Sequence, residues 1–205
     1  MGAKLGTIFA RAGHQVVFSY SRNEAKLRSL ARKAGADARA GTPREAAECD
    51  AVLLAVNWPR VDDALRQAHD LAGKVLLTCA LPMNEDDTEL VIGRASSGAE
   101  QLVKKTRGAH VVSAFGTVPS EALFGVFRRR THSPRPSLVY CGDDAAAKIV
   151  ARGLIHDAGF DPVDVGPLRI ARYIEPCALL VAQVAYEGGR PPDVAYRFER
   201  FPEEE

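Results

Sequence analysis

The chain has 205 residues, of which 46% are hydrophobic and 26% are charged, and its formal net charge is +1. This length and composition suit a single globular domain with a sizeable core. The near-neutral charge gives no argument for nucleic acid or an anionic membrane as a partner, and no apolar run approaches the roughly 18 residues of a spanning helix. Because no secretory signal is visible either, we expect a cytoplasmic location.

The cysteines and histidines show neither the pairing of a disulfide framework nor the spacing of metal ligands. The cysteines are Cys49, Cys79, Cys141 and Cys177. Each lies in an apolar stretch, so we expect buried, reduced thiols and no bound metal.

The first 115 residues alternate between helical and strand patterns, which is typical of a parallel α/β sheet. Asn23 and Gly35 mark the start and end of a helix, and Thr42, Pro43 and Glu45 form a second helix start. The expected helices are 3–12, 24–34, one opening at 43, 59–71 and 97–106, and the expected strands are 16–19, 36–40, 50–56, 74–78 and 111–115.

The second half is less regular. Residues 116–123 are expected to form a turn into a short helix, and a basic loop is expected over 124–136, before the next strand. Strands follow at 138–141 and 162–165, with a helix over 143–158 between them. The last helix, 168–186, is expected to be interrupted near Pro176, since proline cannot donate a helical hydrogen bond.

The end of the second expected strand carries hydroxyl and basic side chains. Ser19, Ser21 and Arg22 follow the apolar strand, and Lys26 lies one turn into the next helix. In a dinucleotide-binding βαβ unit this position meets the adenosine ribose, and NAD would call for an acidic residue there. A guanidinium and hydroxyls suit a 2′-phosphate instead, so the sequence predicts NADP.

The beginning of the chain lacks part of that unit. Gly2 fits the third glycine of a Gly-x-Gly-x-x-Gly fingerprint, but the first strand and the first two glycines would lie before Met1. Two explanations stay open. Either the true start lies upstream, or the protein works without this central strand.

A series of short motifs resembles the NADPH-dependent reductases of the deazaflavin coenzyme F-420. The motifs, taken together for their order and spacing, are Gly2-Ala3, Ser19 to Arg22, Ala55 to Trp58, Gly73 to Val75, Val111 to Pro119, Cys141 to Asp144, Ala158 to Phe160, Asp164 to Leu168 and Arg172 to Pro176. The nucleotide-binding layout is also similar to that of membrane ferric reductases and pyrroline-carboxylate reductases.

The resemblance implies roles for particular residues. It places the pyrophosphate at Gly2, Ala3 and Lys4, the 2′-phosphate at Ser21, Arg22 and Lys26, the nicotinamide half at Ala55, Val56 and Trp58, and the floor beneath the stacked rings at Ala80, Pro82, Phe115, Gly116 and Thr117. Gly116 stands where similar proteins usually carry Asn or His, which puts the identity of the acceptor in question.

We therefore expect a Rossmann-type, doubly wound, mostly parallel sheet that lacks its first strand and carries a small C-terminal helical part. Residues 1–115 would form the NADP-binding core, 116–166 a sheet extension, and 167–205 an acceptor-side and dimer region. Hydride passes directly between the cofactors, so no catalytic residue is required, and Thr117 is the one candidate donor.

The expected function is hydride transfer between NADP(H) and coenzyme F-420. Two alternatives stay open: an NADPH-dependent reductase of a flavin, quinone or other small acceptor, and a non-catalytic nucleotide-binding module. The apolar last helix makes a homodimer plausible.

Overall fold

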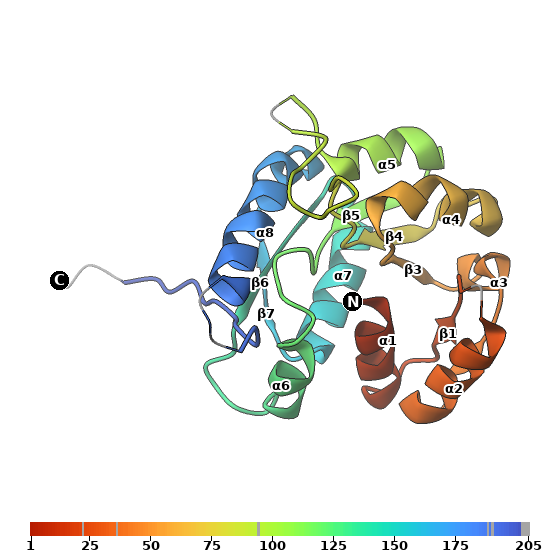
Figure 1. Ribbon diagram of the computed structural model, residues 1–205, viewed down its shortest axis with the longest axis horizontal. Helices are drawn as coiled ribbons and strands as arrows, with labels where there is room; N and C mark the ends of the chain where they lie inside the picture. Colours follow the sequence, from red (N-terminus) through yellow and green to blue (C-terminus); the bar gives the residue numbers. More distant parts are fainter. Residues whose placement is uncertain (22, 36, 94, 188, 190, 202–205) are drawn as a thin grey trace.

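The structure is a computed structural model that describes residues 1–21, 23–35, 37–93, 95–187, 189 and 191–201 (Figure 1). Its α-helices are α1 (Gly2–Arg11), α2 (Glu24–Ala34), α3 (Pro43–Ala47), α4 (Val61–Ala68), α5 (Gly98–Thr106), α6 (Leu123–Arg128), α7 (Ala145–Asp157) and α8 (Ala171–Tyr186). Its strands are β1 (Val17–Phe18), β2 (Arg39–Ala40), β3 (Ala51–Leu54), β4 (Val75–Thr78), β5 (His110–Ser113), β6 (Ser137–Gly142) and β7 (Asp161–Asp164).

The strands form two separate sheets. β1 pairs in parallel with β2, and the other five follow the order β3-β4-β5-β6-β7. All neighbours in the larger sheet are parallel except β5 and β6, which are antiparallel. The predicted α/β class with a mostly parallel sheet is confirmed.

Alternate side chains of the larger sheet enter two cores. Leu77 and Val112 pack with α1, α6 and α7, whereas their neighbours Leu76 and Val111 pack with α4, α5 and α8. Helices on both faces are the reason that these strands read as continuous apolar runs.

Local capping signals fix several helix starts where the sequence predicts them. The Asn23 side chain accepts from the Lys26 amide at the start of α2. Thr42 and Glu45 form a complete capping box at α3, with Pro43 in its first turn. These bonds join residues three apart, so they depend on local sequence alone.

Three expectations were wrong. The basic loop contains α6, because Leu123 and Phe127 bury one side of a helical turn. α8 continues through Pro176, since Ile174, Ala178 and Ala185 share a buried side and hold the helix together.

The third error concerns Cys177. It is exposed on α8, and Cys49 and Cys79 are only half-buried, so Cys141 alone of the four cysteines is buried as predicted. None of the helices in the described ranges combines the length and the hydropathy that a membrane crossing requires.

Gly6 allows α1 to lie against β1. A Cβ atom there would sit 2.4 Å from Cε1 of Phe18, whose ring is buried among Leu27 and Ala31 of α2. We expect Gly6→Ala to lower the free energy of unfolding by about 1–2 kcal/mol, because crowding outweighs the gain in helix propensity. Urea denaturation measures this change.

Gly153 in α7 is the matched control. A Cβ atom at Gly153 would meet nothing within 4 Å. Gly153→Ala should therefore stabilise the protein by up to about 1 kcal/mol. Equal effects of the two substitutions would contradict the role of Gly6.

Candidate functional site

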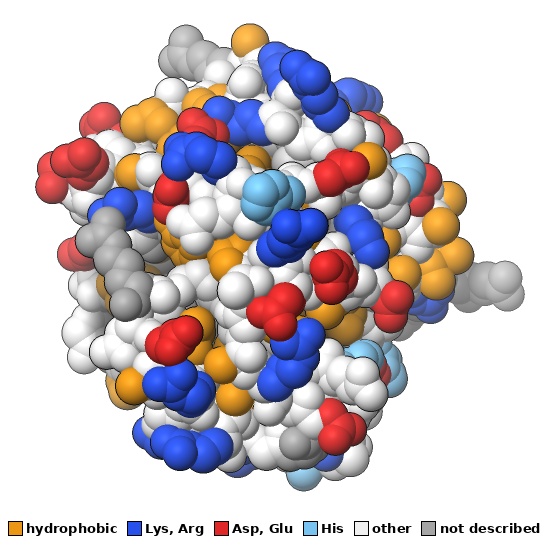
Figure 2. All heavy atoms as spheres, turned by 90° about the vertical axis from the view of Figure 1, so that its right-hand side faces the viewer, with side chains coloured by type: hydrophobic (Ala, Val, Ile, Leu, Met, Phe, Trp, Pro, Cys, Tyr) orange, Lys and Arg blue, Asp and Glu red, His pale blue; other side chains and the backbone are white. Residues whose placement is uncertain are grey.

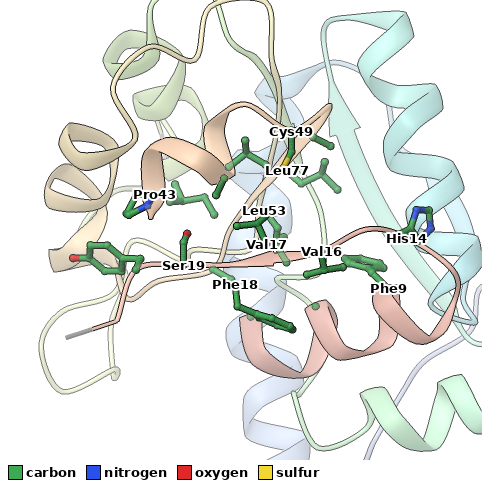
Figure 3. Close-up of a pocket in the computed structure, with 18 of the residues that line it drawn as sticks. Phe9, His14, Val16, Val17, Phe18, Ser19, Pro43, Cys49, Leu53 and Leu77 are labelled. Atoms are coloured by element: carbon green, nitrogen blue, oxygen red, sulfur yellow. The ribbon is translucent and has the colours of Figure 1, made fainter. Parts of the chain in front are cut away.

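The parallel strands end along one edge, and residues from several of them line a common cavity. The cavity lies between β1 and β3, has a volume of about 940 Å³, and is shown in Figure 3. It brings together seven residues that the sequence assigned to the cofactor: Gly2, Ala3, Ser19, Ser21, Lys26, Ala55 and Val56. In open α/β sheets, ligands bind outside the carboxyl ends of the strands.

The first turn of α1 lies directly beside the carboxyl end of β3. A Cβ atom at Gly2 would be 3.1 Å from the Cβ of Ala55, so a larger side chain would push the helix away. The N-cap residue Met1 makes no side-chain capping hydrogen bond. The first amides of α1 therefore keep the arrangement that favours an anion such as pyrophosphate.

The Lys4 side chain contacts the segment after β5. Its Nζ donates to Oγ of Ser120 at 3.1 Å and lies 3.8 Å from Glu121, in the segment after β5. The structure thus gives Lys4 a role in joining α1 to this segment, and its contact with pyrophosphate stays a prediction.

The segment after β1 is held by short-range and longer-range hydrogen bonds. The Oγ of Ser21 accepts from the Asn23 amide at 3.2 Å, and Tyr20 donates to Asp63 of α4 at 2.8 Å. The Tyr20 bond is the main cause that lowers the pKa of Asp63. Lys26 is exposed in the first turn of α2, and Arg22 lies outside the described residues.

A second group of predicted residues lies beyond β4. A Cβ atom at Gly98 would be 3.1 Å from Pro82 and 3.2 Å from the ring of Trp58, so these three positions pack together. Ala80 is buried nearby in the chain. A Cβ atom at Gly116 would be 3.4 Å from Leu81, which places the segments after β4 and β5 side by side.

Phe115 and Thr117 direct their side chains inward. The Phe115 ring is fully buried, with its edge-to-face partners Phe9 and Phe160 at centroid distances of 6.1 and 6.5 Å. The Thr117 hydroxyl is bonded to the hydroxyl of Tyr196 at 2.7 Å, and Thr117 is 1% exposed. Because both side chains are buried, a surface for the stacked cofactor rings at Phe115 and Thr117 would consist of backbone atoms. A role for Thr117 as a hydrogen-bond donor stays a prediction.

Glu175 is a functional candidate that sequence reasoning missed. Its carboxyl group is 3% exposed and accepts from the amides of Gly98 and Ala99 at 2.9 and 3.0 Å. It thereby ties α8 to the start of α5, next to Trp58 and Pro82. Burial raises its pKa to about 7 against the opposing effect of the two amides.

A sequence signal for Glu175 existed. It is the one acidic residue of a mostly apolar helix, and such a carboxyl group must find a partner when it is buried. The Tyr196 contact with Thr117 had no comparable signal, because it joins residues 79 positions apart.

Two thiols near the sheet are poor nucleophiles. Burial raises the pKa of Cys79 to about 12, and its Sγ donates to the carbonyl of Leu54. Burial also raises the pKa of Cys141 to about 12, with its Sγ bonded to the carbonyl of Leu168. Thiols of this kind stay protonated near neutral pH, so they offer no covalent chemistry.

The fold and the grouped strand ends have the architecture that is found in dinucleotide-binding α/β proteins. Residues 1–82 match the family described as NADP oxidoreductase, coenzyme F420-dependent.

One curated relative is metalloreductase STEAP3 of Rattus norvegicus. It is 26% identical over 126 residues, which is 62% of this chain. The chain spans 24% of the length of that relative.

Solved structures share the fold. A protein from Arthrobacter sp. FB24, provisionally assigned as an F-420-dependent NADP reductase, is 23% identical, with a TM-score of 0.83 over 97% of this chain and 94% of that one. A reductive aminase from Aspergillus terreus, in complex with NADPH and ethyl-5-oxohexanoate, is 18% identical, with a TM-score of 0.62 over 92% of this chain and 60% of that one.

Proposed function

We propose that this chain transfers hydride between NADP(H) and the deazaflavin coenzyme F-420. The observation that carries the proposal is the family match over residues 1–82, which covers the grouped Gly2, Ser21, Lys26 and Ala55. When bound, the reduced nicotinamide would supply a hydride from C4 with its electron pair, and the deazaflavin would take up this hydride together with one proton from solvent.

The chain's own residues would bind and orient the cofactor. The uncapped first turn of α1 would face the pyrophosphate, and the small side chain of Ala55 would leave room for it beside β3. Trp58 and Pro82, which pack against the start of α5, would border the nicotinamide half. Holding the nicotinamide and deazaflavin rings in contact can lower the activation barrier by about 7–11 kcal/mol through proximity and orientation.

An absorbance assay tests the acceptor. NADPH and the protein are mixed with coenzyme F-420, and the loss of the deazaflavin band is followed beside parallel reactions with a flavin and a quinone. Turnover with F-420 alone supports the proposal. Turnover with flavin or quinone alone favours the second reading, for which Gly116, with no side chain to contact an acceptor ring, is the specific observation.

A third reading is a nucleotide-binding module without turnover. It is favoured by the open space between β1 and β3, where a Rossmann sheet has its central strand. Binding of NADPH without turnover on any acceptor would support it.

Two other expectations stay predictions. They are the division of the chain near residues 115 and 166 and the cytoplasmic location.

Lys26→Ala should separate NADPH from NADH. We expect NADPH binding to weaken about tenfold and NADH binding to change less than about twofold, because only NADPH carries the 2′-phosphate that an ammonium group attracts. Fluorescence titration of each nucleotide gives the dissociation constants.

The control is Lys33→Ala, in the last turn of the same helix and also exposed. It should leave both nucleotides unaffected. Equal losses of NADPH and NADH binding in the Lys26 variant would rule out the assigned phosphate contact.

We also propose that the protein forms a homodimer through α8. Tyr173, Cys177, Leu180 and Val184 are exposed at spacings of four, three and four residues, which places them on one side of the helix. Exposed apolar faces of this kind mark interaction surfaces. Leu180→Glu should shift the sedimentation coefficient from dimer to monomer if α8 pairs with its copy.

A further inference from the structure

The first half of β6 extends past the ends of the parallel strands. β6 runs antiparallel to β5, and its Cys141 pairs with Ser113, the last residue of β5. Ser113 is level with Thr78 and Leu54, the last residues of β4 and β3. Ser137 comes four residues before Cys141 and therefore lies about 13 Å beyond these carboxyl ends, at a rise of about 3.3 Å per residue. Open α/β sheets bind their ligands at this edge.

The segment after α8, residues 191–201, is bonded to this half of β6. The amide of Ser137 donates to the carbonyl of Tyr196 at 2.8 Å, and the amide of Phe198 donates to Oγ of Ser137 at 3.0 Å. The amide of Val139 donates to the Tyr196 hydroxyl at 3.5 Å. These bonds hold the segment after α8 beside β6, beyond the end of β5.

Tyr196 connects this segment to the chain that follows β5. Its hydroxyl lies 2.7 Å from the hydroxyl of the buried Thr117. Burial raises the pKa of Tyr196, so the phenol keeps its proton near neutral pH and can donate it to this bond. The preceding residue, Gly116, lies against Leu81 of the segment after β4. One phenol thus anchors the backbone at 115–117, where the floor beneath the stacked rings is predicted.

The segment after α8 lies toward the acceptor end of the candidate site. Figure 1 shows α1 between α2, which carries Lys26, and the segment after α8. Figure 2 looks onto the side of α2 and α4, where positive and negative side chains are interspersed. The segment after α8 instead carries aromatic rings: Tyr196 and Phe198 pack edge-to-face at 5.5 Å, and Phe198 is 62% exposed. A dinucleotide with its 2′-phosphate at Lys26 and its pyrophosphate at Gly2 would extend toward these rings.

We propose that the segment after α8 forms a wall of the acceptor pocket, and that Tyr196 is a positioning residue that holds the backbone at 115–117 through Thr117. The acceptor class that fits is a flat conjugated ring, the feature that F-420, a flavin and a quinone share. Such a ring packs flat on backbone atoms and meets the exposed ring of Phe198 face to face with an offset, or by its edge. The inference rests on the proposed function, because it assigns this side of the site to the acceptor.

Two variants that each lose one tyrosine hydroxyl test the inference in the full chain. Tyr196→Phe removes the bond to Thr117 and keeps the ring. Tyr186→Phe is the matched control, because its hydroxyl is bonded to Glu121 at 2.9 Å, which also follows β5 but lies beyond the predicted floor. Steady-state rates give KM and kcat with F-420, a flavin and a quinone, and fluorescence titration gives the dissociation constant of NADPH.

We expect Tyr196→Phe to raise the KM of the acceptor about tenfold, which is the effect of one lost hydrogen bond on an equilibrium. The value of kcat and the dissociation constant of NADPH should change less than about twofold, and Tyr186→Phe should leave all three unchanged. An unchanged acceptor KM in Tyr196→Phe would overturn the proposal. Equal weakening of acceptor and NADPH would overturn it as well, because it would indicate a general loosening of the fold.

The route through Thr117 has its own test. If Tyr196 acts through Thr117, the double variant Tyr196→Phe, Thr117→Val should raise the acceptor KM no more than the larger single change. Fully additive changes would show that Tyr196 does not act through Thr117 and would overturn that part of the proposal. Thr117→Val removes the same bond from the other side and replaces Tyr196→Phe in the comparison if that variant does not fold.

Failure of the proposed function is distinguishable from failure of this inference. If a flavin or a quinone is turned over but F-420 is not, the proposed function fails, and the KM comparison with the accepted compound still decides the role of Tyr196. If the unmodified protein turns over none of them, equilibrium dialysis measures F-420 binding. Weaker binding to the Tyr196 variant than to the Tyr186 variant then supports the wall without hydride transfer, and equal binding or no binding overturns it.

Discussion

Phe115→Ala is expected to lower the free energy of unfolding by about 3–5 kcal/mol, the usual result of emptying a buried aromatic site. Phe115 is fully buried, and its ring packs edge-to-face between Phe9 of α1 and Phe160 before β7. These partners come from widely separated parts of the chain, so they cannot easily close around a void. Urea denaturation of the variant and of the unmodified protein measures the loss.

Two controls define the result. Phe201 is 86% exposed, and Phe201→Ala should change the free energy of unfolding by less than about 0.5 kcal/mol. Phe115→Leu keeps most of the volume and should remain folded. If Phe115→Leu retained its stability but lost NADPH binding, the ring would have a direct role at the cofactor that its buried position does not suggest.

The second large effect is a pH dependence that originates at Glu175. Burial raises its pKa from 4.5 to about 7 in the folded protein, and the charge of Glu100 adds to this rise. Between these two values the unfolded chain loses the proton while the folded protein keeps it. The protonated Glu175 therefore contributes to the free energy of unfolding at low pH. This contribution, about 3 kcal/mol in total, is lost as the pH rises through about 7.

Denaturation at pH 5 and pH 8 measures this contribution, with Glu175→Gln as the comparison. The glutamine variant keeps the side-chain shape but cannot ionise, so its unfolding free energy should fall about 2–3 kcal/mol less over this interval than that of the unmodified protein. Carboxyl groups with lowered pKa values, such as Glu45 and Asp63, titrate below this range and affect both proteins equally. Identical slopes would show that Glu175 is already ionised at pH 5.

Part of the candidate site follows from sequence alone. Ser19, Ser21, Lys26 and Ala55 follow apolar strands, and parallel strands bring their carboxyl ends to one edge of the fold. The structure groups these residues around one cavity. The positions of Phe115 and Thr117 did not follow, because the direction of a side chain after a strand depends on what it packs against.

The tertiary contacts also decided which sequence signals prevailed. Pro176 interrupts the local hydrogen bonding of α8, but burial of Ile174 in the core that it shares with α5 and the sheet, and burial of Ala178, keep the helix continuous. Glu175 found its two amides at the start of α5, 76 and 77 residues away. No local pattern specifies such a pairing.

The sequence by itself determined the helix starts at Asn23 and Thr42 and the alternation of helices and strands. These features depend on hydrogen bonds within four residues and on the apolar period of each segment. Only the tertiary structure decided that the strands separate into two sheets between β1 and β3. It also decided that the Phe115 ring packs in the core and that the Thr117 hydroxyl is hydrogen-bonded to the Tyr196 hydroxyl. Each of these depends on partners distant in the chain, whose approach is set by the packing of the whole fold.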